Sequence, residues 1–240
     1  EVGFENPLLG GKVAHRALQL FFRDLAEKGG VFDPEKLPAY RDIMQRSLER
    51  SMEEYERRGL DLFPPEWRRQ RAILKPRLDA FLEEEALNFP RFTVEETETR
   101  MRADISDGVS FSGIIDRVSS VSGRPAVVDY KSGEVPKKKS FTSKDGIPEL
   151  SQMPIYLLLA ERGYIEERGE SGDPEETAER DLCGRKPPRK VSALSYYSVK
   201  NRAYTHLLYD GPGEASDKVG DEGMHRMAER VAEAGQELRD

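Results

Sequence analysis

The feature that most constrains the fold is a pair of short β-strand patterns joined by a tight turn. Residues 109–118 and 125–131 are rich in apolar and β-branched side chains, and Ser122-Gly123 lies between them. A two-residue turn of this kind favours a β-hairpin and fixes its register. The chain is therefore expected to build part of a β-sheet around this segment, with the two strands antiparallel.

The predicted register brings two carboxylates together. Asp116 lies directly opposite Asp129, and opposed side chains share a face with Cβ atoms about 4.5–5.5 Å apart. Because side chains alternate along a strand, Lys131 lies on that face too. Opposed carboxylates repel each other unless a cation lies between them or one keeps a proton. The cluster is therefore either an internal ion-pair network or a divalent-metal site with an ammonium group beside it.

The metal interpretation gives each group a chemical role. Mg²⁺ prefers oxygen ligands and keeps several waters. It can polarise a phosphoryl oxygen and lower the pKa of a bound water. A neighbouring lysine such as Lys131 can hold or activate that water and offset the negative charge that develops at phosphorus. The residue types therefore suit the hydrolysis of a phosphate ester.

Hydrophobic periodicity around the hairpin predicts mixed α and β structure. Apolar residues recur at helical spacing in residues 11–27, 39–59, 65–88, 146–163 and 217–238. Strand patterns occur in residues 92–103, 191–199 and 203–209. Pro154 should fall in the first turn of its helix, and Gly163 should end that helix. This order predicts a central mixed β-sheet flanked by helices, in a single domain over residues 1–240. We interpret residues 39–89 as a surface helical insertion and residues 166–190 as a charged, flexible loop.

Composition narrows the class of protein. The chain has 240 residues, of which 37% are hydrophobic and 35% charged, and a net charge of −7. An acidic chain is unsuited to coating nucleic acid, although a local basic patch is compatible with it. The single cysteine, Cys183, excludes an internal disulfide and fits a reducing, cytoplasmic compartment. The longest strong apolar run, residues 155–160, falls short of the ~18 residues of a membrane span, so we expect no membrane association. Since the chain starts at Glu1, we interpret it as processed or as a piece of a longer protein.

Four sequence blocks occur in a fixed order along the chain. They are GKVAH at 11–15, GIIDR at 113–117, DYKSG at 129–133 and QMPIY at 152–156. Together they resemble the motifs of the PD-(D/E)XK nucleases, and of the RecB-like branch in particular. That branch includes the C-terminal nuclease domains of AddB- or RecB-type helicase–nucleases and stand-alone relatives. The combination is specific, whereas an Asp-x-Lys pattern alone is weak.

The resemblance implies a fold and a set of roles. The fold would be a restriction-endonuclease-like α/β core with an extra N-terminal helical region. The implied metal ligands are His15, Asp116, Asp129 and the backbone carbonyl of Tyr130. Lys131 would be the catalytic lysine, acting with Asp116 and Asp129. The residues expected to support the site or contact DNA are Arg117, Gln152, Tyr156 and Glu98. For the glutamate on the strand before Asp116, Glu95 and Glu96 remain alternatives.

The implied activity is Mg²⁺- or Mn²⁺-dependent hydrolysis of DNA phosphodiester bonds, as an exonuclease on single strands or ends. The acidic charge suggests that helicase domains or a helicase subunit deliver the substrate, within DNA repair or recombination. Some relatives carry a four-cysteine iron–sulfur cluster, which one cysteine cannot build, so none is expected. Two alternatives stay open: a non-catalytic DNA-binding or assembly module, and a phosphodiesterase that acts on RNA or nucleotides.

Ordinary structural roles also remain open for the site residues. A lone histidine such as His15, at the edge of an apolar helix stripe, is often only a packed core residue. Asp116 and Asp129 could form ion pairs with neighbouring basic residues, which stabilise a protein little. Gln152 and Tyr156 could be a polar cap and a core aromatic. His206, in an alternating strand, is expected to be structural or solvated.

Overall fold

The structure is a computed structural model that describes residues 7–58, 64–106, 109–136, 152–165, 189–209 and 228–233. Three long helices precede most of the strands. The elements are α1 (Pro7–Glu27), β1 (Val31–Phe32), a short 3₁₀ helix (Pro34–Lys36), α2 (Leu37–Arg57), α3 (Pro64–Asn88), β2 (Phe92–Ser106), β3 (Val109–Val121), β4 (Arg124–Lys131), α4 (Gln152–Arg162), β5 (Tyr164–Ile165), β6 (Ala193–Ser198) and β7 (Ala203–Tyr209).

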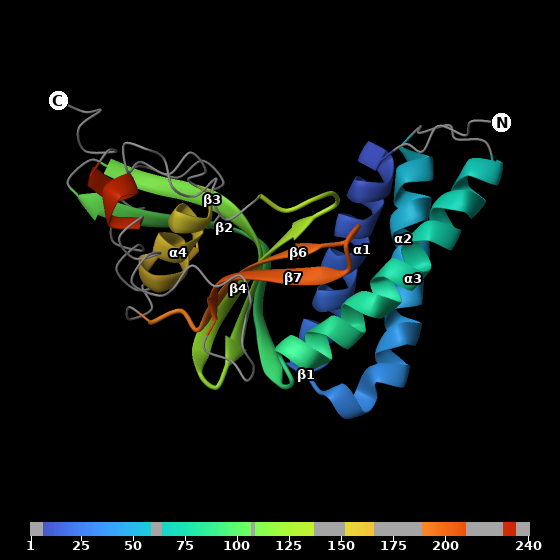
Figure 1. The fold of residues 1–240 in the computed structure, drawn as a ribbon, viewed down its shortest axis with the longest axis horizontal. Helices are drawn as coiled ribbons and strands as arrows, with labels where there is room; N and C mark the ends of the chain where they lie inside the picture. The colour runs from blue at the N-terminus through green and yellow to red at the C-terminus, as the bar shows by residue number, and fades with distance from the viewer. Residues whose placement is uncertain are drawn as a thin grey trace, which may run out of the picture.

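The strands among the described residues form one mixed sheet. Its order is β1-β2-β3-β4-β6-β7. β1 pairs with the first residues of β2, and β5 pairs with Met101 and Arg102 further along the same strand. β4 and β6 are parallel, whereas the remaining pairs are antiparallel. Figure 1 shows α1, α2 and α3 gathered on one side of the sheet and α4 on the other. The predicted mixed sheet with flanking helices is therefore confirmed.

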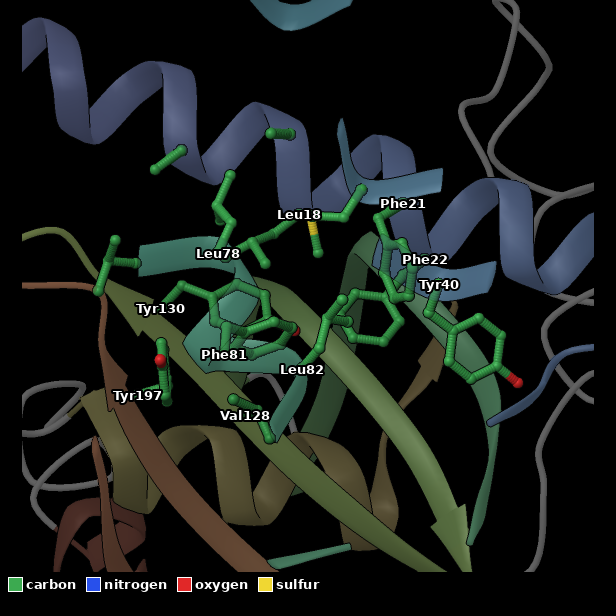
Figure 2. Close-up of a cluster of buried hydrophobic side chains, with 14 of the residues drawn as sticks. Leu18, Phe21, Phe22, Tyr40, Leu78, Phe81, Leu82, Val128, Tyr130 and Tyr197 are labelled. Carbon is green, nitrogen blue, oxygen red and sulfur yellow. The ribbon is translucent and has the colours of Figure 1, made fainter. Parts of the chain in front are cut away.

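The larger hydrophobic core lies between the first three helices and the sheet. The apolar residues that recur at helical spacing along α1 are almost fully buried: Ala14, Ala17, Leu18, Phe21 and Leu25. Tyr130 of β4 lies beneath α1 and contacts the rings of Phe22 and Phe81 (Figure 2). Phe81 and Leu82 are 0% exposed. The helices within residues 39–89 thus pack against the sheet and form one side of the larger core. Their outer faces are charged, which is why the sequence pattern indicated a surface insertion.

A second core lies between α4 and the opposite face of the sheet. Leu157 and Leu159 of α4 are 0% exposed and share this cluster with Val127 of β4. Pro154 lies in the first turn of α4, as predicted. Gly163 directly follows α4, and its N–H donates to the Leu159 carbonyl at 2.9 Å. An added Cβ would lie 2.3 Å from that oxygen, so a residue with a side chain does not fit there. This core holds α4 at a fixed position behind β3 and β4.

The central hairpin has the register predicted from its turn. Ser122 and Gly123 both have positive φ, 52° and 80°, as a type I′ turn requires. The β3–β4 ladder runs from Val121↔Arg124 to Arg117↔Val128 and stops there. The two strands therefore separate at the next position, where Asp116 and Asp129 lie.

Some expectations lie outside the described residues. These are the segments 146–151, 166–188, 217–227 and 234–238, together with Cys183. The described piece of the last predicted helix, residues 228–233, is helical, and its Ala228 belongs to the second core. None of the described helices combines the length and the apolar character needed to cross a membrane.

His206 of β7 is a buried structural histidine, and its protonation should make the free energy of unfolding depend on pH. Its Nδ1 lies 2.7 Å from Ser195 Oγ and its Nε2 lies 2.8 Å from Asn88 Oδ1. Burial lowers the pKa of His206 to about 4. An unfolded histidine has a pKa near 6.5. The neutral ring therefore stabilises the fold fully above pH 6.5, and that contribution is lost as the pH falls towards 4.

We expect the free energy of unfolding to drop by about 2–3 kcal/mol between pH 7 and pH 4.5 on account of His206 alone. Urea unfolding of the wild type and of His206→Gln at the two pH values measures this contribution, because glutamine does not titrate. An equal pH dependence in the two proteins would contradict it.

Candidate active site

Three acidic residues lie on neighbouring strands, at the point where β3 and β4 separate. The β2–β3 pairs on either side of Glu98 place it opposite Asp116, and the hairpin register places Asp129 beside Asp116. Glu98 has a φ of 51°, which is uncommon for a residue other than glycine and costs backbone energy. The backbone is therefore irregular at the point where the acidic side chains gather.

His15 of α1 lies between two of these carboxylates. Its Nδ1 is 3.0 Å from Glu98 Oε1, and its Nε2 is 3.0 Å from Asp116 Oδ2. Burial by itself would lower the pKa of His15, but the hydrogen bonds to Asp116 and Glu98 outweigh it and raise the pKa to about 10. Without a metal, the imidazolium ion therefore supplies the positive charge that holds the two carboxylates together.

The donor atoms of this cluster fit a divalent cation. One ligand atom from each of His15, Glu98 and Asp116 can be chosen so that all lie within 4.8 Å of one another. Two carboxylates suit Mg²⁺ or Mn²⁺, which complete their shells with water or substrate, and the imidazole adds a nitrogen ligand. Because histidine binds metal as the neutral ring, a cation would replace the proton on His15.

A second polar cluster adjoins the first. Lys131 Nζ lies 2.7 Å from Asp129 Oδ2 and donates to Gln152 Oε1 at 3.0 Å. Gln152 Nε2 donates to Asp129 Oδ1 at 2.9 Å. The three side chains therefore form a closed ring that fixes the ammonium group beside the carboxylates. Burial raises the pKa of Asp129 to about 6, the charge of Asp116 acts in the same direction, and Lys131 opposes both.

Tyr156 ties α4 to the strand that bears Asp116. Its hydroxyl donates to the Ile114 carbonyl at 2.6 Å and accepts from Gln152 Nε2 at 3.1 Å. Gln152 and Tyr156 share one face of α4 because they are four residues apart. The helix predicted to support the site thus contacts β3 and the Asp129–Lys131 pair at once.

Tyr130 supports the site from the core side. Its backbone N–H donates to Asp116 Oδ2 at 2.7 Å. Its ring packs edge-on to the His15 ring, with centroids 5.9 Å apart. The orientations of the Asp116 and His15 side chains therefore depend on Tyr130.

Arg117 points away from these clusters into the larger core. Its Nη1 lies 3.0 Å from Glu85 Oε2 of α3, and the two side chains are 1% and 0% exposed. The guanidinium lies 4.4 Å and 4.9 Å from the ring centroids of Phe22 and Phe92. Because the Arg117 side chain is buried, it cannot contact DNA in this structure, which was one of the two roles expected of it. The other expected role, support of the site, is compatible with burial.

The three candidate glutamates of β2 have different partners. Glu95 forms a two-bond ion pair with Arg189, at 2.8 Å and 2.7 Å. Glu96 accepts a hydrogen bond from the Thr99 hydroxyl. Only Glu98 of the three lies in the cluster with His15.

Sequence reasoning missed Tyr196, whose ring centroid lies 5.3 Å from Lys131 Nζ. A cation–π contact of this kind helps to hold an ammonium group in place. Tyr196 reaches the site because β6 pairs in parallel with β4, which sets it beside Asp129. No local signal in the sequence reveals that pairing.

Comparison with known proteins identifies the family to which the chain belongs. A sequence model of the PD-(D/E)XK nuclease superfamily matches residues 3–240, nearly the whole chain. No match to the chain was found among curated proteins or among solved structures. The family match covers both polar clusters and the helices and strands that position them, and the chain belongs to the PD-(D/E)XK nuclease superfamily.

Proposed function

We propose that the chain is a Mg²⁺- or Mn²⁺-dependent deoxyribonuclease that acts as an exonuclease on single strands or ends. The observation that supports this most is that two clusters of different chemistry lie close enough for the charges of Asp116 and His15 to act on Asp129. His15, Glu98 and Asp116 offer a donor set for a cation. Asp129, Lys131 and Gln152 hold an ammonium group next to that set.

Each residue has a defined task in this proposal. His15, Glu98 and Asp116 would hold the metal, with Asp129 and the Tyr130 carbonyl as further ligands. A bound divalent cation supplies Lewis acidity towards the scissile phosphate and makes a bound water more acidic. Lys131 positions the attacking water and offsets the charge that develops on the phosphate oxygens. Gln152 holds Lys131 and Asp129 in register, and Tyr156 holds Gln152.

We further propose that helicase domains or a helicase subunit supply the DNA, in repair or recombination in the cytoplasm. The net charge of −7 supports this, because an acidic chain attracts a polyanion poorly without help. The nuclease chemistry proposed above does not depend on this partnership.

The proposal predicts that the purified chain cleaves an end-labelled single-stranded DNA oligonucleotide in Mg²⁺ or Mn²⁺ and that EDTA stops the reaction. Asp129→Ala and Lys131→Ala should each be inactive on gels that resolve single nucleotides. The same assay on RNA tests the preference for DNA, and the same assay on circular single-stranded DNA tests whether cleavage requires a free end. Equal activity of either variant and the wild type would contradict the mechanism. Metal binding without turnover of any nucleic acid would favour the non-catalytic module.

A further inference from the structure

A small pocket adjoins the candidate metal site on the α1 side. Its volume is about 210 Å³, and it is lined by Gly11, Lys12, His15, Tyr130, Ser132 and Val199. His15 and Tyr130 belong to both the pocket and the site described above. The volume is below the roughly 300 Å³ at which pockets begin to enclose whole small molecules. The pocket therefore suits one chemical group of a larger ligand.

The shape of this pocket depends on a close approach of α1 to the end of β4. A Cβ added to Gly11 would lie 2.5 Å from Ser132 Cβ and 2.7 Å from Ser132 Oγ. Ser132 follows Lys131 directly, and the Val199 N–H donates to the Lys131 carbonyl at 2.9 Å. The pocket thus lies where the parallel strands β4 and β6 end, which is the usual place for ligands in open α/β sheets.

The charge of this pocket is opposite to that of the neighbouring cluster. None of its six lining residues is acidic, and Lys12 and Ser132 are both exposed to solvent. The ammonium of a lysine and the hydroxyl of a serine are common partners of phosphate oxygens. A phosphate here would face an ammonium group and a hydroxyl instead of a carboxylate.

We propose that this pocket binds the phosphate of the nucleotide next to the scissile one, through Lys12 and Ser132. This inference rests on the proposed nucleic-acid substrate and adds a strand contact on the α1 side of the metal site. It assigns to Lys12 the orientation of the strand and no part in the chemical step.

The test is binding of a fluorescent oligo-dT to the full chain carrying Lys131→Met, in Mg²⁺, by anisotropy over a range of salt concentrations. Lys12→Gln should raise Kd about tenfold. It should also reduce the slope of log K against log salt by about 0.7, the value for one phosphate contact on a single strand. Ser132→Ala should raise Kd about threefold with little change of slope.

Two control variants make the result specific. Lys12→Arg keeps the charge and should keep the salt slope. Lys28→Gln removes the same charge from an exposed site just past the other end of α1 and should change neither quantity. Parental Kd and slope in Lys12→Gln would overturn the pocket assignment, and the proposed hydrolysis would stand if the wild type still cleaves DNA. The expected rise in Kd and fall in slope for Lys12→Gln, with no cleavage by the wild type, would support the pocket and overturn the hydrolysis.

Discussion

Lys131→Met should lower the rate of DNA cleavage by about 10²–10³-fold while leaving metal binding in place. Lys131 contacts Asp129 and Gln152 and is not among the three clustered residues that fit a cation. Methionine keeps most of the side-chain volume and removes the ammonium group. The loss should therefore appear in kcat, because the charge acts on the transition state more than on the bound substrate.

A matched control is Lys200→Met, since Lys200 is exposed, lies outside both polar clusters and pairs with the exposed Glu134 at 3.5 Å. Single-turnover cleavage and Mn²⁺ titration of both variants separate chemistry from binding. Cleavage by Lys131→Met at more than a tenth of the wild-type rate would contradict the assigned role.

Glu85→Leu should lower the free energy of unfolding by about 3–5 kcal/mol. Glu85 and Arg117 are a buried pair that connects α3 to β3, and the Tyr204 hydroxyl of β7 also donates to Glu85. Burial alone would lower the pKa of Arg117, but the Glu85 carboxylate raises it, so Arg117 stays charged. Removing Glu85 leaves that charge buried among aromatic rings without its counter-ion.

Two further variants show whether the lost charge balance is the cause. Glu85→Leu with Arg117→Met should recover most of the stability, because replacing both members of a buried pair with apolar residues is often neutral. Glu83→Leu removes the partner of Arg41 in an exposed pair two residues away and should cost less than about 1 kcal/mol. Urea unfolding measures all three. A similar loss from Glu85→Leu and Glu83→Leu would contradict this account.

The sequence predicted the parts of the site that depend on local rules. Ser122-Gly123 defines a turn with one strong register, so the proximity of Asp116 and Asp129 followed from it. The spacing of Gln152 and Tyr156 predicted a shared helix face, and both contact the site. The resemblance to a nuclease family added His15, which no local rule places next to β3.

The choice of Glu98 depended on an irregularity that local rules do not reveal. Regular pairing from Ser106↔Val109 would set Thr99 opposite Asp116. A register shift between Asp104 and Ser106 moves the strand by one residue and sets Glu98 there instead. A β-bulge of this kind depends on packing across the sheet as well as on the residues that form it.

The role of Arg117 could not be predicted because its partner is distant in the sequence. The family resemblance implied a role for Arg117 at the site, but its guanidinium lies among the rings on the α1–α3 side, whereas Ile115 packs in the core that contains α4. Ile115 and Arg117 are two residues apart and would share a face in a regular strand, so the alternation of side chains is broken at Asp116. Glu85, the counter-ion, comes from a helix that the charge pattern alone marked as surface.

The most direct test of the central claim is diffraction from crystals soaked in Mn²⁺, recorded to locate the anomalous signal of manganese. We expect a manganese peak within bonding distance of His15, Glu98 and Asp116, beside Lys131. Wild-type crystals with His15 still between the two carboxylates, and with manganese elsewhere or absent, would contradict it.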